Sequence, residues 1–313
     1  MKAIRVHRFG SPEVMAFEDL SRPIPAANEV LVRVEAAGVG PWDASIRAGR
    51  SALPQPLPLT LGSDIAGTIE SVGHEVSAFA AGDAVYGVTN ERFTGGYAEY
   101  AVAKASMIAS KPRRLSFIEA ASLPVIAVTA WQMLFDQAGV RAGQRVLILG
   151  AAGNVGALAV QLAHRRRTHV IAVISSDDEQ RLRTLGADEI IDTRAAGPEW
   201  RTLPVDAVID AAGGDKQRQA IALLKPGGFL VSSVSPPDPN LMRQHDVRGA
   251  FFLVNATTAV LNEITALVDS GALSTNVATV LPLESARVAH EMLEGTRPYP
   301  RGKIVLNIQR NTP

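Results

Sequence analysis

The stretch at residues 144–164, QRVLILGAAGNVGALAVQLAH, decides the fold. Its apolar run at residues 146–149 has the length and branching of a buried parallel strand, and the run stops at Gly150. The residues beyond the glycines repeat with helical spacing, which predicts a helix. The apolar face of this helix is formed by Leu158, Val160, Leu162 and Ala163. A strand, a glycine-rich turn and a helix in this order are typical of the start of a nucleotide-binding α/β domain.

The glycines of the turn are spaced as in a dinucleotide-binding motif. Gly153 and Gly156 match the last two glycines of G-x-G-x-x-G, and Ala151 stands at the first position. A glycine at position 153 lets the backbone approach a pyrophosphate, and one at position 156 lets the helix lie close to its strand. The free N–H groups of the first helical turn would then point at the anion. Glycine also serves such turns for steric reasons alone, so a turn without a ligand remains an alternative.

The end of the next strand bears on the choice of cofactor. The strand at residues 169–174 ends in Ser175 and Ser176. An acidic residue there would bind the ribose hydroxyls of NAD and repel a 2′-phosphate, whereas hydroxyl side chains can donate hydrogen bonds to the phosphate. The serines therefore favour NADP.

Six short apolar runs alternate with helical patterns in the middle of the chain and predict an α/β fold with a Rossmann doubly wound parallel sheet. The runs are VLIL (146–149), VIAVI (170–174), EIID (189–192), AVID (207–210), FLVSSV (229–234) and FFLV (251–254). Residues 1–117 are expected to form a β-rich domain, and residues 118–255 the dinucleotide-binding domain. The tail at residues 256–313 is too short for a core of its own, so it is expected to return to the β-rich domain.

The composition excludes several classes of protein. The 31 basic and 31 acidic side chains cancel, so no net charge favours nucleic acid or an anionic membrane. The chain has no cysteine, which excludes disulfides, thiol nucleophiles and cysteine-ligated zinc. The start, MKAIRVHRFG, lacks a secretory apolar core and is expected to form a strand of a cytoplasmic protein.

A series of short motifs follows in a fixed order along the chain. They are AGV (37–39) with Pro41 and Asp43, LGSDIAG (61–67), VG (72–73), GDAVYG (82–87), GGYAEY (95–100), TAW (129–131), AAGNVG (151–156), LGAD (185–188), KPGG (225–228) and RGKIV (301–305). With these motifs the chain resembles the zinc-independent quinone oxidoreductases, the zeta-crystallin-like family of the medium-chain dehydrogenase/reductase superfamily, over nearly its whole length.

This resemblance implies a GroES-like β-rich domain formed by both chain ends, a Rossmann domain in the middle and an NADP(H) site in the cleft between them. It implies direct hydride transfer to a small-molecule quinone or α,β-unsaturated carbonyl, without a metal, by a homodimer. An alternative is a non-catalytic, NADPH-binding crystallin-like protein or an RNA-binding regulator. The neutral charge, without a basic stripe interleaved with aromatic residues, counts against an RNA surface.

Zinc-dependent relatives provide a contrast. Where they place a cysteine and a histidine as metal ligands, this chain has Gly40 and Ser63. Without cysteines it cannot supply a second thiolate, so no metal site is expected. A substrate whose own conjugation activates it toward hydride fits such a site better than an alcohol does.

The resemblance also implies site residues. Those expected to contact NADP(H) are Pro41, Thr129, Gly150, Ala152, Gly153, Asn154, Val155, Gly156, Ser175, Ser176, Arg181, Ala212, Val234, Phe252 and Val254. Thr129 has an alternative role as a helix N-cap or back-bonded threonine. Phe252 and Val254 have an alternative place at the edge of a dimer.

Two residues are candidates for catalysis. Ser45 stands where some family members have a tyrosine suspected of donating a proton, and Asp43 lies nearby. A salt bridge between Asp43 and Arg47 is the alternative for that carboxylate.

Two positions count against NADP. Family members that prefer NADP often carry a lysine and a tyrosine where this chain has Glu179 and Thr193. Three arginines could offset the charge of Glu179, namely Arg181, Arg183 and Arg194. The missing acid at Ser175 keeps NADP favoured over NAD.

Overall fold

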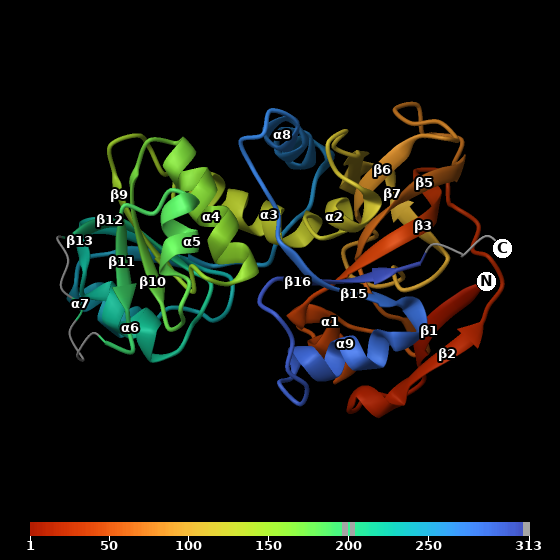
Figure 1. The fold of residues 1–313 in the computed structure, drawn as a ribbon, viewed down its shortest axis with the longest axis horizontal. Helices are drawn as coiled ribbons and strands as arrows, with labels where there is room; N and C mark the ends of the chain where they lie inside the picture. The colour runs from red at the N-terminus through yellow and green to blue at the C-terminus, as the bar shows by residue number, and fades with distance from the viewer. Residues whose placement is uncertain (196–199, 201–203, 309–313) are drawn as a thin grey trace. The chain divides into compact units, whose positions relative to one another are not determined.

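The structure, a computed structural model, describes residues 1–195, 200 and 204–308. Its internal contacts divide the chain into two units (Figure 1). The first unit contains Met1–Val125, Ala256–Gly271 and the chain from Thr275, and the second contains Ile126–Asn255 and Ala272–Ser274. The domain bounds expected from the sequence, at residues 117 and 255, stay predictions.

The second unit is built on a six-stranded parallel sheet in the order β11-β10-β9-β12-β13-β14. In chain order the strands are β9 (Arg145–Leu149), β10 (His169–Ile174), β11 (Glu189–Asp192), β12 (Val205–Asp210), β13 (Leu224–Ser232) and β14 (Arg248–Phe251). The side chains at residues 146–149 of β9 are fully buried, as expected for a parallel strand covered on both faces. This order confirms the predicted doubly wound Rossmann fold.

Helices connect these strands. They are α4 (Asn154–Arg165), α5 (Glu179–Thr184), α6 (Asp215–Ile221) and α7 (Pro239–Gln244). From the centre of the sheet the chain winds outward in one direction through β10 and β11, and in the other through β12, β13 and β14. Because such crossovers are right-handed, α4 and α5 cover one face and α6 and α7 the other. The winding reverses between β9 and β12, so the carboxyl ends of these strands are where a ligand is expected.

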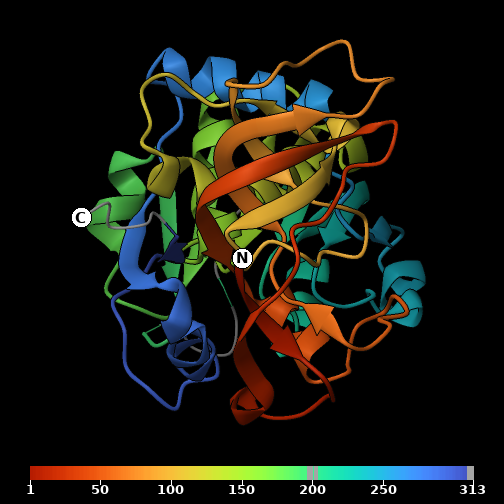
Figure 2. The ribbon, with the colours of Figure 1, turned by 90° about the vertical axis from the view of Figure 1, so that its right-hand side faces the viewer.

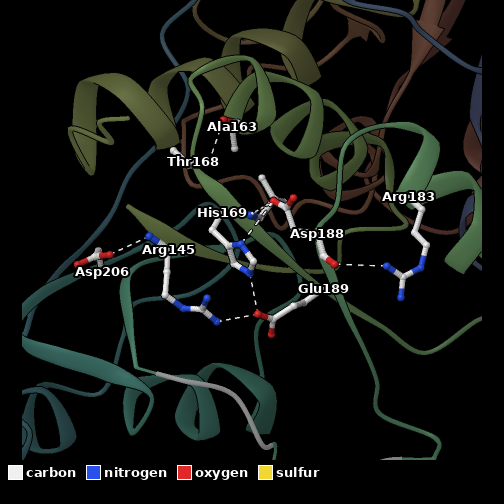
Figure 3. A network of polar contacts seen from close by, with 9 residues as sticks. Arg145, Ala163, Thr168, His169, Arg183, Asp188, Glu189 and Asp206 are labelled. Atoms are coloured by element: carbon white, nitrogen blue, oxygen red, sulfur yellow. Dashed lines mark hydrogen bonds and ion pairs between the residues drawn. The ribbon is translucent and has the colours of Figure 1, made fainter. Parts of the chain in front are cut away.

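An ionic network lies at the opposite, amino-terminal end of this sheet (Figure 3). His169 Nε2 lies 2.6 Å from Glu189 Oε1, and the Arg145 guanidinium donates to the same carboxylate at 2.9 Å. The backbone N–H of Arg145 donates to Asp206 Oδ2 at 2.7 Å. These contacts join β9, β10, β11 and β12 where the strands begin, and they fix the strand register away from the glycine-rich turn.

The first unit holds a seven-stranded sheet, with β15, β16, β3, β5, β6 and β8 in that order and β7 paired to β3. Its strands are β3 (Glu29–Val39), β5 (Asp64–Val72), β6 (Ala84–Val88), β7 (Tyr100–Lys104), β8 (Ile108–Ser110), β15 (Val277–Pro282) and β16 (Lys303–Asn307). A smaller sheet contains β1 (Lys2–Val6), β2 (Met15–Asp19) and β4 (Leu59–Thr60). Figure 2 shows the red and orange amino-terminal strands of this β-rich unit.

The carboxy-terminal segment completes the first unit. β16 pairs antiparallel with β3 and parallel with β15, so the last strand described lies inside a sheet whose first strand in the sequence begins at residue 29. The helices of this unit are α1 (Pro41–Arg47), α2 (Phe117–Ala121), α8 (Thr258–Asp269) and α9 (Ala286–Leu293). The sequence pattern of Ser116 followed three residues later by Glu119 predicts the N-cap of α2. The structure confirms it, because Ser116 Oγ accepts from the N–H of Glu119 and the Glu119 side chain accepts from the N–H of Ser116.

Two sequence-based assignments are wrong in detail. The sixth strand was expected at residues 251–254, but β14 spans Arg248–Phe251, so Phe252 and Val254 follow the strand. β14 pairs on one side only, with β13, so its residues need not form the continuous apolar run that burial on both faces requires. Thr129 was assigned to a helix start, but α3 (Pro124–Trp131) begins five residues earlier, which excludes the N-cap role.

Candidate functional site

The glycine-rich turn connects β9 to α4, and its glycines have different roles. Gly150 has a φ of 70°, in the left-handed region that favours glycine. A Cβ atom on Gly156 would lie 2.2 Å from the carbonyl oxygen of Gly150 and 2.7 Å from Cα of Ala151. A Cβ on Gly153 would meet only the carbonyl oxygen of Gly150, at 3.2 Å. Gly156 therefore permits close packing of α4 on the turn, whereas Gly153 leaves exposed backbone open to a ligand.

The first turn of α4 presents backbone donors. Gly153 is the N-cap residue and, in the described part of the chain, no side chain caps the helix. The first N–H groups of a helix have no intrahelical acceptor, and here they belong to Asn154, Val155 and Gly156. The first return hydrogen bond runs from the N–H of Ala157 to the carbonyl oxygen of Gly153, at 2.9 Å. These donors, with the helix dipole behind them, fit the pyrophosphate of a dinucleotide.

The loop after β10 carries the residues expected at the adenosine end. Ser175 is exposed, whereas the hydroxyl of Ser176 donates to Asp178 Oδ2 at 2.6 Å. Arg181 Nε donates to Asp178 Oδ1 at 3.0 Å, and a terminal nitrogen of Arg181 donates to the carbonyl oxygen of Ala152 at 2.8 Å. Arg181 thus ties α5 to the glycine-rich turn, and Ser175 is the exposed hydroxyl of the pair.

The charges near this loop are largely paired. Glu179 forms an ion pair with Arg183 at 2.9 Å, one turn along α5. Arg194 contacts Asp177 at 2.8 Å and Asp192 at 2.6 Å. Hydrogen bonds from the Arg194 side chain and backbone hold the pKa of Asp192 at about 2. Of the three arginines considered for offsetting Glu179, Arg183 neutralises that carboxylate directly.

The loops after β12 and β13 approach the glycine-rich turn within the second unit. A Cβ on Gly150 would lie 3.2 Å from the carbonyl oxygen of Ala211 and 3.3 Å from Cβ of Ala212. A Cβ on Gly213 would lie 3.0 Å from Cγ1 of Val234, which is 50% exposed. Gly150, Ala212 and Val234 therefore lie close together at the carboxyl ends of the parallel strands.

Three other residues are also expected to contact the cofactor. Phe252 and Val254 are partly buried in the segment after β14, and the N–H of Phe252 donates to the carbonyl oxygen of Ser232 at 3.2 Å. Thr129 is buried within α3. Their roles toward a cofactor stay predictions.

The catalytic candidates lie on α1 of the first unit. Pro41 is exposed at the first position of the helix, and Ser45 is partly buried. Asp43 is fully buried; its Oδ2 accepts from the N–H of Gly40 at 2.8 Å and from the Tyr97 hydroxyl at 2.9 Å. Burial raises the pKa of Asp43 to about 7. The carboxyl fixes the start of α1, and direct catalysis by Asp43 or Ser45 stays a prediction.

The expected salt bridge between Asp43 and Arg47 is wrong. Arg47 pairs with Glu294, and its guanidinium also donates to the carbonyl oxygen of Gly10 at 2.9 Å and to Nδ1 of His290 at 3.2 Å. Burial and the nearby Arg47 charge lower the pKa of His290 to about 3, so this histidine is neutral. Asp43 caps the start of α1 while Arg47, at its end, reaches α9, so the two side chains serve opposite ends of one helix.

The pH dependence of stability is expected to report on Asp43. Because its pKa in the folded protein, about 7, lies above the ordinary value of 3.8, the folded state binds more protons between these values and the free energy of unfolding falls as pH rises. Asp43→Asn keeps an acceptor for Gly40 and Tyr97 and cannot ionise. Relative to wild type it is expected to be similar in stability at pH 4 and more stable by up to about 4 kcal/mol at pH 8. Denaturant unfolding at both pH values measures this, and a pH-independent difference would contradict it.

Sequence reasoning missed several polar side chains that organise the two units. Asp210 and Ser232 are buried at the carboxyl ends of β12 and β13. In the first unit, Trp42 Nε1 donates to Ser63 Oγ at 3.0 Å, and the Lys303 ammonium lies 4.5 Å from the centre of the Trp42 ring. A polar residue at the end of an otherwise apolar strand was the available signal for Asp210 and Ser232, whereas nothing local pointed to the contact of Lys303 with Trp42.

The doubly wound sheet, the glycine-rich turn and the first-turn amides of α4 are the features of a dinucleotide-binding fold, and the chain also forms a second, β-rich unit. Comparison with known protein families supports this description of the fold. Residues 26–113 match the alcohol dehydrogenase GroES-like domain, and residues 185–306 match the zinc-binding dehydrogenase family.

Comparisons with individual proteins identify the family more closely. Quinone oxidoreductase of Sus scrofa is 33% identical over 324 residues, which cover 98% of this chain and 97% of the relative. The structure of the quinone oxidoreductase from Coxiella burnetii matches with a TM-score of 0.90 and 35% identity, over 99% of both chains. Escherichia coli quinone oxidoreductase complexed with NADPH matches with a TM-score of 0.88 and 26% identity, over 98% of this chain and 100% of the other. This chain belongs to the quinone oxidoreductase family, the zeta-crystallin-like NAD(P)H-dependent branch of the medium-chain dehydrogenase/reductase superfamily.

The residues of this chain do not fit the zinc ion that one family description implies. Across residues 1–195, 200 and 204–308, no three His, Cys, Asp or Glu side chains come together as a metal site. A side chain at position 40 is also obstructed, because a Cβ on Gly40 would lie 2.3 Å from the Trp42 ring. The indole is held in place by Ser63, the residue that stands at the expected histidine position.

Proposed function

We propose that this protein is a zinc-independent, NADPH-dependent reductase that acts on a quinone or an α,β-unsaturated carbonyl compound. The observation that carries the proposal is the glycine-rich turn, in which Gly156 permits close packing and the exposed Gly153 leaves space beside the first turn of α4. Membership of the quinone oxidoreductase family supports the same reaction class. A bound nicotinamide cofactor supplies the hydride.

In this proposal the residues of the chain bind the cofactor and orient it. The amides of Asn154, Val155 and Gly156 hold the pyrophosphate, and Ser175 and Arg181 face the adenosine end. The loops of Ala212 and Val234 position the nicotinamide end. The hydroxyl of Ser45 or a water molecule supplies the proton that the reduced product requires.

An assay of NADPH oxidation at 340 nm tests the proposal. Turnover with 1,4-benzoquinone, a naphthoquinone or a simple enone is the expected result. Tight NADPH binding by fluorescence titration without turnover of any of these acceptors would favour the alternative, a non-catalytic crystallin-like or regulatory protein. Absence of NADPH binding would contradict the proposal outright.

The preference for NADPH is expected to depend on the uncharged tip of β10. Ser175→Asp places a carboxylate at the exposed position, where it would repel a 2′-phosphate and accept hydrogen bonds from an unphosphorylated ribose. The ratio of kcat/KM with NADPH to kcat/KM with NADH is expected to fall by about tenfold or more. Steady-state kinetics with both cofactors measure this ratio.

The control variant is Ser175→Asn, which has nearly the same shape as Ser175→Asp without its charge. It should change the cofactor ratio much less. Equal use of NADPH and NADH by the wild type would remove the basis for this preference.

We also propose that the protein is a homodimer, as the resemblance to its family implies. Among the described residues no helix is long and apolar enough to cross a membrane. Light scattering after size exclusion should give twice the mass of one chain, and a single-chain mass would contradict the dimer.

A further inference from the structure

A buried carboxyl group joins the segments at the carboxyl ends of β12 and β13. Asp210, the last residue of β12, is fully buried. Its Oδ1 accepts hydrogen bonds from the backbone N–H of Ala212 at 3.0 Å and of Gly213 at 2.7 Å. Its Oδ2 accepts from Gln217 Nε2 at 2.9 Å and from Ser232 Oγ at 2.8 Å. Both oxygens are thus used, and they contact β13, α6 and the loop after β12.

Ser232 extends these contacts to the loop after β13. Its hydroxyl oxygen accepts from the N–H of Val234 at 3.1 Å and from the N–H of Ser235 at 3.2 Å. Gln217 Nε2 also donates to the carbonyl oxygen of Ser235 at 3.0 Å. Asp210 therefore controls the backbone of two loops, one directly and one through Ser232 and Gln217.

The position of Asp210 connects these loops to the glycine-rich turn. Asp210 pairs across the sheet with Leu149 on β9 and with Ser232 on β13. Leu149 directly precedes Gly150, and the N–H of Ala211 donates to the carbonyl oxygen of Leu149 at 3.2 Å. The carboxyl group thus lies at the carboxyl ends of the parallel strands, where the pyrophosphate is proposed to bind.

A contribution to stability does not by itself explain why residue 210 is an acid. In the part of the chain that the structure describes, no lysine or arginine pairs with Asp210, and the four donors are neutral. Burying a carboxyl group without a cation is costly, and hydrogen bonds from neutral donors offset this cost only in part. What the carboxyl group provides is geometry, because two acceptor atoms fix four donors at once.

The topology indicates which half of the cofactor these loops would hold. In a doubly wound sheet the dinucleotide crosses the point where the strand order reverses, with its two halves on opposite sides. β10 and Ser175 lie on one side of β9, the proposed adenosine side, whereas β12 and β13 lie on the other. We propose that Asp210 is a positioning residue that fixes the binding surface for the nicotinamide half of the cofactor. This inference rests on the proposed function.

The test compares a whole cofactor with a fragment. Asp210→Asn removes the acceptor for Gln217 and Ser232 while nearly keeping the shape of the side chain. The dissociation constant of NADPH is expected to rise about tenfold or more, because a buried donor loses its partner and the loops shift. The dissociation constant of adenosine 2′,5′-bisphosphate, which lacks the nicotinamide half, is expected to stay within about twofold. Calorimetric titration of both ligands measures this difference.

The matched control is Asp206→Asn on the same strand. Asp206 lies near the amino-terminal end of β12, where it contacts Lys225 at 2.7 Å and the N–H of Arg145. Its substitution should leave the ratio of the two dissociation constants unchanged. Ser232→Ala provides a second, smaller change, which removes the acceptor for the amides of Val234 and Ser235 and should again weaken NADPH selectively.

The outcomes are distinguishable. If Asp210→Asn and Ser232→Ala weakened both ligands equally, or neither, Asp210 would be only a structural residue and the inference would be wrong while the proposed function stood. If the wild type bound the fragment but not NADPH, or bound neither, the proposed function would be wrong and the inference with it.

Discussion

Replacing Gly156 with valine is expected to abolish NADPH binding and to destabilise the second unit. A Cβ at this position would lie 2.2 Å from the carbonyl oxygen of Gly150, which is backbone and cannot rotate away as a side chain could. Helix α4 would have to move off the turn, and overpacking of this kind costs about 3 kcal/mol or more. For a protein of this size, that loss lowers the melting temperature by about 5–10 °C. Circular dichroism melting and fluorescence titration with NADPH measure the two effects.

Gly153→Ala is the matched comparison for that variant. The added methyl group meets only one backbone atom, at 3.2 Å, and the residue is exposed. Its melting temperature should stay close to that of the wild type, whereas NADPH affinity should fall because the methyl group enters the space proposed for the pyrophosphate. Normal NADPH binding by Gly156→Val would show that the turn does not hold the cofactor.

Lys303→Met is expected to cost about 3–5 kcal/mol of unfolding free energy. Lys303 Nζ lies 3.0 Å from Asp64 Oδ2, and both side chains are almost completely buried, at 1% and 0% exposed. Burial raises the pKa of Asp64 and the Lys303 charge lowers it, so loss of the lysine leaves an uncompensated buried acid. The contact of the ammonium with the Trp42 ring is lost as well. Urea denaturation followed by circular dichroism measures the change.

Two further variants separate charge from packing. The double variant Lys303→Met with Asp64→Leu removes both charges and should recover much of the loss. Lys2→Met breaks an exposed ion pair with Asp19 at 2.6 Å, and it is expected to change the free energy of unfolding far less than Lys303→Met does. If Lys303→Met lowered the free energy of unfolding no more than Lys2→Met does, the ion pair of Lys303 with Asp64 would not stabilise the packing of the carboxy-terminal strand within the first unit.

Local patterns in the sequence predicted the parts of the structure that depend on neighbouring residues. The turn at Gly150, the N-cap at Ser116 and the central parallel strands follow from apolar periodicity and the conformational needs of a few residues. The sixth strand was displaced by three residues because an edge strand lacks the apolar signature of a buried one.

The polar contacts could not be predicted in this way. Arg47 pairs with Glu294, 247 residues away, and Lys303 with Asp64, 239 residues away. No spacing rule connects such positions, so the nearer acid, Asp43, was the natural but wrong partner for Arg47. Asp210 carried a local signal, but its role became visible only with the donors from β13 and α6 in place.

The pairing of β16 with β3 has a consequence for synthesis on the ribosome. Residues 36–39 at the end of β3 receive this partner only when residues 303–307 have emerged, long after the six parallel strands are complete, whereas residues 29–33 of β3 already pair with β7. At about 5–20 residues per second, the nascent chain keeps this short segment without its native partner for roughly 13–55 seconds after residue 39. An uncovered strand edge can template association with other chains. The second unit can therefore fold first, and we expect the end of β3 to be open to association with other chains until β16 has emerged.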